Sequence, residues 1–182
     1  MHAAGSGVRD AAIQIAKVMG ARLVAGTAGT SEKLAKAAEL GLDIGINYNE
    51  QDFAEEVLRA TEGRGVDVLL DVVGASYWER NMQSLARKGR MVIVGLMGGS
   101  AGQVELGVLQ AKRLQVRGTG LRARSLEEKA LATRAFERSV LPHVASGRIR
   151  TVVDRTFPLS DAAGAHRYME TNANFGKIVL EV

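Results

Sequence analysis

Short apolar runs alternate with amphipathic stretches along this chain, and glycine marks most of the joints between them. Apolar runs bounded by turn residues predict strands, and apolar positions that recur with the period of a helical turn predict helices. The strongest strands are predicted at residues 66–73 and 91–94, where the nearly continuous apolar character predicts burial on both faces of a parallel sheet. Alternation of strand and helix at this spacing predicts an α/β fold built on a doubly wound parallel sheet.

The remaining elements are predicted from weaker signals. Further strands are expected at residues 23–25, 44–47, 114–118, 152–157 and 178–182, and helices at 8–19, 31–40, 52–61, 77–87, 106–111, 126–145 and 160–171. Ser76 with Glu79, and Ser125 with Glu128, have the spacing of a capping box at a helix start. Pro142 predicts a break in the helix that contains it. The last two strands either extend the same sheet or belong to another lobe.

Composition narrows the function classes. The 182 residues, 46% hydrophobic and 24% charged, suffice for a domain with its own core. Cysteine is absent and the three histidines are scattered, so neither a cysteine nucleophile nor a metal site is expected. No apolar run approaches the roughly 20 residues of a membrane span, and no secretion signal is recognisable. A cytoplasmic protein without membrane association is predicted, and the net charge of +4 without a basic block predicts no nucleic-acid partner.

The N-terminal turn has the character of a phosphate cradle. Gly5, Ser6 and Gly7 precede a helix whose N-H groups and dipole would attract an anion. One face of that helix is expected to be buried through Val8, Ala11, Ala12, Ile15, Ala16 and Met19. A strict G-x-G-x-x-G is missing, so an ordinary strand-to-helix turn is the alternative interpretation.

The end of the next strand indicates which nucleotide would bind. Sites for NAD, and many for S-adenosylmethionine, place an acidic residue there, but none occurs before Glu32. Thr30, Ser31 and Lys33 instead suit the 2′-phosphate of NADP. The alternative is that Ser31 caps the helix and Lys33 is solvated.

Several segments together carry a resemblance to a known family. They are residues 2–8, 11–14, 27–29, 32–34, 47–48, 52–53, 74, 76–79, 95–99, 141–143 and 176–180. On these residues the chain resembles the quinone oxidoreductase branch of the medium-chain dehydrogenase/reductase superfamily, and most closely the p53-inducible quinone oxidoreductase type. The resemblance implies a Rossmann-like fold, NADPH as cofactor, and zinc-independent reduction of quinones or related enones.

The resemblance also implies where the cofactor lies. It places the pyrophosphate on the N-terminal turn, the 2′-phosphate on Lys33 and Tyr48, and the ribose and nicotinamide against later strand ends. The expected contacts are Gly5, Ser6, Gly7, Val8, Thr27, Gly29, Ser31, Lys33, Tyr48, Val73, Gly74, Gly95, Leu96, Met97, Leu121, Phe175 and Lys177. No catalytic residue is assigned, because Asp71 at its strand end is expected to cap a neighbouring helix.

Other implications concern domain organisation. Residues 1–150 would form the dinucleotide-binding domain with a shortened first strand, and residues 151–182 would normally complete a GroES-like catalytic lobe. Arg9 stands where family members commonly have glycine, so its side chain is expected to point outward. A homodimer joined through residues 114–118 is expected. The alternatives are an enoyl-thioester reductase on the same scaffold and a non-catalytic NADPH-binding fragment.

Overall fold

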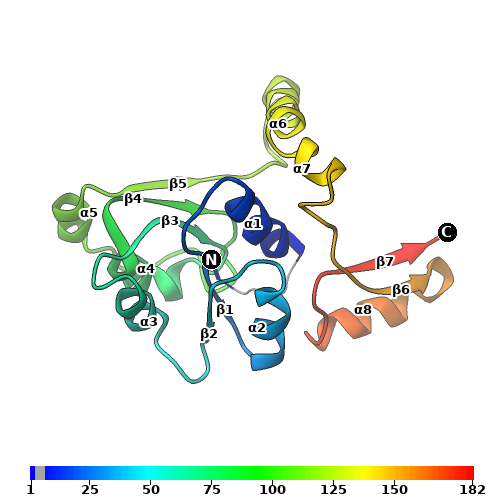
Figure 1. The fold of residues 1–182 in the computed structure, drawn as a ribbon, viewed down its shortest axis with the longest axis horizontal. Coiled ribbons are helices and arrows are strands. Elements are labelled where there is room, and N and C mark those ends of the chain that lie inside the picture. Colours follow the sequence, from blue (N-terminus) through cyan, green and yellow to red (C-terminus); the bar gives the residue numbers. More distant parts are fainter. Residues whose placement is uncertain (3–6) are drawn as a thin grey trace. The chain divides into compact units, whose positions relative to one another are not determined.

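A computed structural model describes residues 1–2 and 7–182 of the chain (Figure 1). These residues form two compact units. The first consists of residues 1–2 and 46–131, and the second of residues 7–45 and 132–182. Helices alternate with strands, and β3, β4 and β5 pair in parallel, as do β6 and β7. The predicted α/β class with parallel sheets is confirmed.

The elements follow the predicted order. The helices are α1 Gly7–Val18, α2 Ser31–Ala38, α3 Phe53–Ala60, α4 Trp78–Ser84, α5 Leu106–Lys112, α6 Leu126–Ser139, α7 Leu141–Ala145 and α8 Ala162–Glu170, with short 3-10 turns η1 Ala75–Tyr77 and η2 Leu159–Asp161. The strands are β1 Ala25–Ala28, β2 Ile44–Asn47, β3 Val66–Asp71, β4 Leu85–Ile93, β5 Gln115–Gly118, β6 Val153–Pro158 and β7 Lys177–Glu181. They lie in the sheets β1-β2, β3-β4-β5 and β6-β7. The last two strands, β6 and β7, pair with each other and do not extend the sheet β3-β4-β5.

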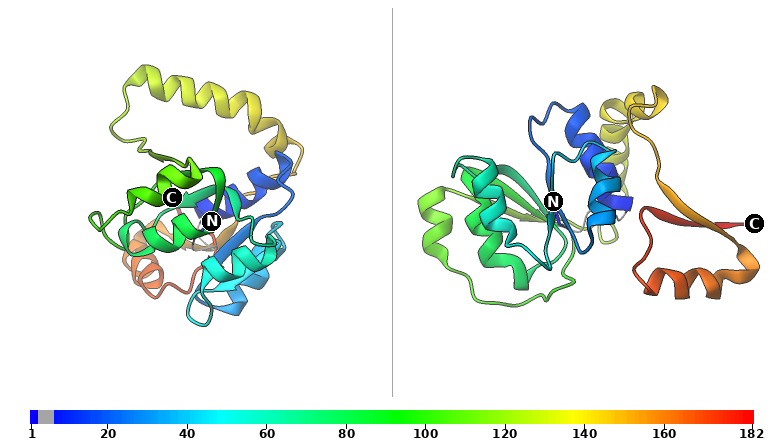
Figure 2. Two further views of the ribbon diagram at one scale, coloured as in Figure 1. Left: turned by 90° about the vertical axis from the view of Figure 1, so that its left-hand side faces the viewer. Right: turned by 60° about the horizontal axis from the view of Figure 1, so that its bottom comes forward.

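The core of the first unit lies on the sheet β3-β4-β5. Its buried members are Leu69, Met82, Leu85 and Met91, and side chains from α4 and α5 pack against them. In Figure 2 the helices α4 and α5 lie beside the green strands of this unit. Leu69 on β3 stands opposite Met91 on β4 in the parallel register. Val68, the residue before Leu69 on β3, is 55% exposed, so the prediction that this strand is buried on both faces is wrong. Its side chains alternate because successive residues of a strand point to opposite faces of the sheet.

Helix caps account for several boundaries. The capping box at Ser125 and Glu128 is confirmed, since each backbone N-H donates to the other residue's side chain, at 3.0 and 3.3 Å. The one predicted at Ser76 and Glu79 is wrong, because α4 starts after η1 without a side-chain cap. The helix predicted at 126–145 is broken as expected, with Pro142 in the first turn of α7.

Helix α4 ends earlier than predicted, and Lys112 explains how. Leu85 pairs with Val66 at the start of β3, which takes the chain out of the helix. The Lys112 ammonium then donates to the backbone carbonyls of Met82, Gln83 and Leu85 at 2.9, 2.9 and 2.8 Å. A cation at this end of a helix also interacts favourably with the helix dipole. Lys112 therefore satisfies carbonyls that the helix leaves without an internal partner.

In the second unit, α1 is buried on a different face from the one expected. Val8 and Met19 are exposed, whereas Arg9, Asp10, Ile13 and Gln14 are buried. Arg9 is only 8% exposed, so the expectation that it points outward is wrong. The Gln14 amide explains part of this orientation: it donates to the Arg150 carbonyl at 3.0 Å and accepts from the Arg150 N-H at 2.9 Å. A side chain that matches both backbone groups of one residue fixes the rotation of the helix.

Replacing Lys112 by Met should lower the free energy of unfolding by about 1–3 kcal/mol, because three carbonyls lose a charged donor. Chemical denaturation followed through Trp78 fluorescence measures this loss. Lys88→Met, at an exposed position of β4, is the matched control and should change stability by less than about 0.5 kcal/mol. Equal effects of the two variants would contradict the role given to Lys112.

Candidate functional site

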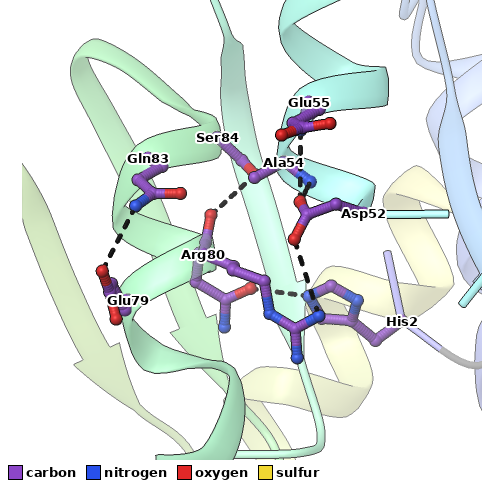
Figure 3. Close-up of polar contacts among 9 residues, drawn as sticks. His2, Asp52, Ala54, Glu55, Glu79, Arg80, Gln83 and Ser84 are labelled. Atoms are coloured by element: carbon purple, nitrogen blue, oxygen red, sulfur yellow. Dashed lines mark hydrogen bonds and ion pairs between the residues drawn. The ribbon is translucent and has the colours of Figure 1, made fainter.

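A buried aromatic cluster in the first unit brings together residues from three of the segments that carry the family resemblance. His2 lies edge-on to Phe53 and Tyr77, with ring centroids 4.5 and 4.9 Å away. Its Nε2 lies 2.7 Å from Oδ1 of the fully buried Asn81 (Figure 3). His2 is itself buried, and burial raises the pKa of the Tyr77 hydroxyl. These motif residues hold α3, η1 and α4 together.

Arg80 covers the outer side of this cluster. Its guanidinium lies 4.9 and 4.6 Å from the ring centroids of Phe53 and Tyr77. It also lies 3.8 Å from the Asp52 carboxylate (Figure 3). Asp52 caps α3 by accepting from the N-H groups of Ala54 and Glu55. The charged pair is therefore committed to packing and capping, and the similarity at these positions reflects the fold.

Past the ends of β3 and β4, two loops continue to pair through their backbones. We call them the paired loops, residues 72–76 and 94–99. Gly98 N-H donates to the Val73 carbonyl at 2.6 Å, and Ala75 and Ser76 N-H donate to the carbonyls of Gly99 and Gly98 at 3.0 and 3.2 Å. Gly74 has φ +85°, and a Cβ on it would come 2.6 Å from the Gly99 carbonyl oxygen. Only glycine permits this close approach.

The Asp71 carboxylate fixes the first of the paired loops. It is 1% exposed, and its two oxygens accept from the N-H groups of Val73 at 2.8 Å and Gly74 at 3.0 Å. The expectation that Asp71 caps a neighbouring helix is thus wrong in detail, because the carboxylate binds the turn that directly follows its own strand. Asp71 holds the backbone at Val73 and Gly74, both expected cofactor contacts.

Apolar side chains project from this end of the first unit. Leu96 and Met97 follow β4, and Leu121 follows β5; all three are exposed, Met97 by 82%. Gly95 lies close to the other paired loop, since a Cβ there would come 3.0 Å from the Val72 carbonyl oxygen. Large exposed apolar groups beside a rigid backbone suit a binding surface for a flat, weakly polar group.

The second unit contains most of the residues expected to hold phosphates, the exception being Tyr48. Gly5 and Ser6 lie outside the described residues, while Gly7 begins α1 and Val8 is exposed in its first turn. The stem of Lys177 crosses Gly7 so closely that a Cβ on this glycine would lie 2.4 Å from the Lys177 Cε. A lysine stem thus lies across the N-terminus of a 12-residue helix, where backbone N-H groups attract anions.

Lys33 lies in the first turn of α2. Thr30 caps this helix through its side-chain oxygen, which accepts from the Lys33 N-H at 3.3 Å, so Thr30 takes the capping role considered for Ser31. The Lys33 ammonium donates to the backbone carbonyl of Asn172 and lies 3.4 Å from its Oδ1. Burial lowers the Lys33 pKa, and the negative charges of Asp154 and Glu32 oppose that shift.

The other expected contacts occupy different places. Thr27 lies within β1 and is buried, and Gly29 follows that strand in the second unit. Tyr48 follows β2 in the first unit and is partly exposed. Phe175 is buried, with its N-H donating to Asp154 Oδ1 at 3.0 Å. Phe175 therefore anchors the turn that leads from α8 into β7.

Three features of these regions could not be expected from the motifs. Asn172 contacts Lys33 across 139 residues of sequence, Gly98 pairs with the Val73 carbonyl, and Lys177 packs on Gly7. The sequence offers one signal for the first of them. An Asn just after a predicted helix can adopt the left-handed conformation, as Asn172 does with φ +54°.

Comparison with known proteins places the chain in a family. The model of the zinc-binding dehydrogenase family matches residues 7–137. Quinone oxidoreductase 1 of Escherichia coli is 37% identical over 98% of the chain, which spans 55% of that relative. The crystal structure of an Escherichia coli quinone oxidoreductase complexed with NADPH is similar with a TM-score of 0.82 and 36% identity, over all of this chain and 56% of that one.

A crystal structure described as an NAD-dependent alcohol dehydrogenase is also similar, with a TM-score of 0.84 and 38% identity over all of this chain and 50% of that one. The chain thus spans about half the length of these proteins. Among the residues that the structure describes, no helix is both long and apolar enough to cross a membrane. The predicted resemblance to quinone oxidoreductases is confirmed, and the chain belongs to the zinc-binding dehydrogenase family.

Proposed function

We propose that this chain is the NADPH-binding part of an oxidoreductase that reduces quinones or related enones. The observation that carries the proposal is the pair of helix N-termini in the second unit, each associated with a lysine. Lys177 crosses the start of α1 at Gly7, and Lys33 lies in the first turn of α2. Helix N-termini and ammonium groups both bind phosphate, so the two suit the pyrophosphate and the 2′-phosphate of this cofactor.

The residues present fit such a cofactor. Gly7 lies against the Lys177 stem and Gly95 against the Val72 carbonyl, so both glycines belong to closely packed turns at strand and helix ends. A dinucleotide's phosphates and ribose bind at such turns in α/β sheets. In the first unit, the backbone of the paired loops is held rigid by Asp71. We assign the ribose and nicotinamide to Val73, Gly74, Gly95–Met97, Leu121 and Phe175. We assign the adenosine end to Thr27, Gly29, Ser31 and Tyr48.

In the mechanism that follows, the bound nicotinamide supplies a hydride. The chain's own residues would orient the cofactor, because the paired loops present fixed backbone groups. The exposed Leu96 and Met97 would cover one side of a bound nicotinamide and exclude water from it. No side chain of this chain is assigned to proton transfer.

Zinc independence is part of the proposal and rests on the side chains present. The sequence has no cysteine, and the described residues bring no three of His, Asp and Glu together as a metal site would require. The matching family's description refers to zinc, so this point needs its own test.

Three further parts of the proposal concern the setting of the site. The alternative activity is that of an enoyl-thioester reductase, and the alternative class is a non-catalytic NADPH-binding protein. Comparing the turnover of a quinone with that of an enoyl thioester separates the two activities, and turnover of neither supports the non-catalytic class. The proposal also includes a homodimer joined along β5 and a cytoplasmic location. Residues 1–150 would form the dinucleotide-binding domain, and residues 151–182 would complete a catalytic lobe.

The chain should bind NADPH at least roughly tenfold more tightly than NADH, because the 2′-phosphate gains a charged partner. Titration calorimetry with both cofactors measures the ratio. Lys33→Met should remove most of the preference. Lys36→Met, one turn further along α2, should leave the ratio within about twofold. Equal binding of NADH and NADPH by the unaltered chain would contradict the assignment of a 2′-phosphate site.

Replacing Asp71 by Asn should weaken the paired loops. The amide keeps one acceptor but turns an N-H donor toward a backbone N-H, which should reduce the free energy of unfolding by about 1–3 kcal/mol. NADPH affinity should fall several-fold as well. Asp67→Asn on the same strand removes only an exposed pair with Arg64 and should cost less than about 1 kcal/mol. Calorimetry and denaturation of both variants decide the point, and unchanged NADPH affinity in Asp71→Asn would argue against it.

Oxidation of NADPH by benzoquinone should be insensitive to metal removal. The assay is run on the chain alone and on a version extended upstream by a catalytic lobe, before and after EDTA treatment. Rates should agree within about twofold, as expected when nicotinamide chemistry needs only orientation. Loss of activity in EDTA with recovery on adding Zn²⁺ would overturn zinc independence.

A further inference from the structure

The Lys33 ammonium has two oxygen partners that belong to a single residue on another element. It donates to the backbone carbonyl of Asn172 and lies 3.4 Å from the side-chain Oδ1 of the same residue. Asn172 follows α8 directly, with φ +54°, and its N-H donates to the Met169 carbonyl at 3.0 Å. Lys33 on α2 therefore binds the chain at the C-terminal end of α8.

Helix dipoles favour this arrangement over a free Lys33. In the first turn of α2 the ammonium stands at the positive end of its own helix, which is unfavourable for a cation. At the end of α8, a nine-residue helix, it meets the negative end of another. Asn172 thus gives Lys33 a favourable position, but both of its oxygens are neutral acceptors.

A phosphate would be a stronger partner for the same ammonium. Charge-assisted hydrogen bonds are roughly twice as strong as neutral ones. Burial lowers the Lys33 pKa, which indicates that Asn172 and the nearby charges of Asp154 and Glu32 do not fully replace water around the ammonium. A dianion at the N-terminus of α2 would also reverse the unfavourable interaction of Lys33 with its own helix.

The turn that Lys33 holds leads toward the other phosphate-binding element. Beyond Asn172, the Ala173 N-H donates to the Thr171 hydroxyl at 3.3 Å, and the chain is anchored again at Phe175. It then enters β7, where the Lys177 N-H donates to the Val152 carbonyl at 2.9 Å. Residues 171–174 are therefore fixed at both ends, and Lys33 is the attachment that an anion can displace.

We propose that the contact between Lys33 and Asn172 is a latch that the 2′-phosphate of the bound cofactor opens. The phosphate takes the ammonium, Asn172 is released, and residues 171–174 become mobile while Phe175 stays anchored. The latch rests on the proposed 2′-phosphate site. It adds that, in the protein without cofactor, Asn172 occupies the Lys33 ammonium and competes with the phosphate for it. It makes Asn172 a residue that tunes the preference for NADP over NAD.

The test uses 2′-AMP, which carries the phosphate in question, and 5′-AMP as its matched control. Amide hydrogen exchange followed by NMR should speed up several-fold at Asn172 and Ala173 when 2′-AMP binds, with Phe175 and Lys177 unchanged. The Lys33 side-chain NζH₃ and Cε signals should shift in the same titration. Binding of 5′-AMP should produce neither change.

Variants separate the latch from the site itself. Asn172→Asp turns the resident partner into an anion and should weaken 2′-AMP binding by roughly fivefold. Ala173→Asp adds the same charge at the neighbouring exposed position and should have a clearly smaller effect. Asn172→Gly keeps the left-handed backbone but removes Oδ1, and should bind 2′-AMP at least as well as the original chain.

The outcomes distinguish the two proposals. If 2′-AMP binds, depends on Lys33, and leaves exchange at Asn172 and Ala173 unchanged or slower, the phosphate site stands and the latch is overturned. If Asn172→Asp and Ala173→Asp weaken binding equally, the latch is again overturned, because only general charge matters. If 2′-AMP does not bind or binds equally well to Lys33→Met, the proposed site fails and the latch fails with it.

Discussion

The constraint on which this molecule depends is that backbone N-H and carbonyl groups beyond the last regular hydrogen bond of each strand and helix need partners. Parallel strands and helix ends leave such groups without partners. In the first unit they are satisfied within the protein: Asp71 accepts from two N-H groups, and the paired loops use one another. Lys112 does the same for the carbonyls at the end of α4. The result is a rigid surface next to exposed apolar side chains.

In the second unit, lysine side chains lie at the starts of α1 and α2 instead. The start of α1 is crossed by a lysine stem, and the lysine at the start of α2 is held by neutral oxygens of Asn172. Both arrangements leave positive potential where an anion would complete the pairing. The cofactor proposal assigns the phosphates to the helix starts of the second unit and the nicotinamide to the apolar surface of the first.

The sequence predicted those features that depend on near neighbours in the chain. The apolar pattern located β3 and the last residues of β4, whose first part was predicted as helix. The spacing of Ser125 and Glu128 predicted a capping box that forms as expected. Features set by distant residues were missed. The buried face of α1 differs from the apolar stripe, and Gln14 binds the backbone of Arg150, 136 positions away. The end of α4 depends on Lys112, which no local signal near Ser84 or Leu85 reveals.

The candidate site divides in the same way. The predictions drawn from the glycines, and from the lack of an acid before Glu32, needed only local backbone geometry and local charge. Asp71, by contrast, was expected to cap a helix but binds the turn after its own strand. The role of Asn172 was missed because it depends on a contact with Lys33 across 139 residues. The most direct test of the central claim is an NMR map of backbone amide shifts on adding NADP⁺. The account predicts changes at Gly7–Arg9 and Thr30–Lys33 together with Gly74 and Gly95–Gly98; changes confined to one of these sets, or located elsewhere, would contradict it.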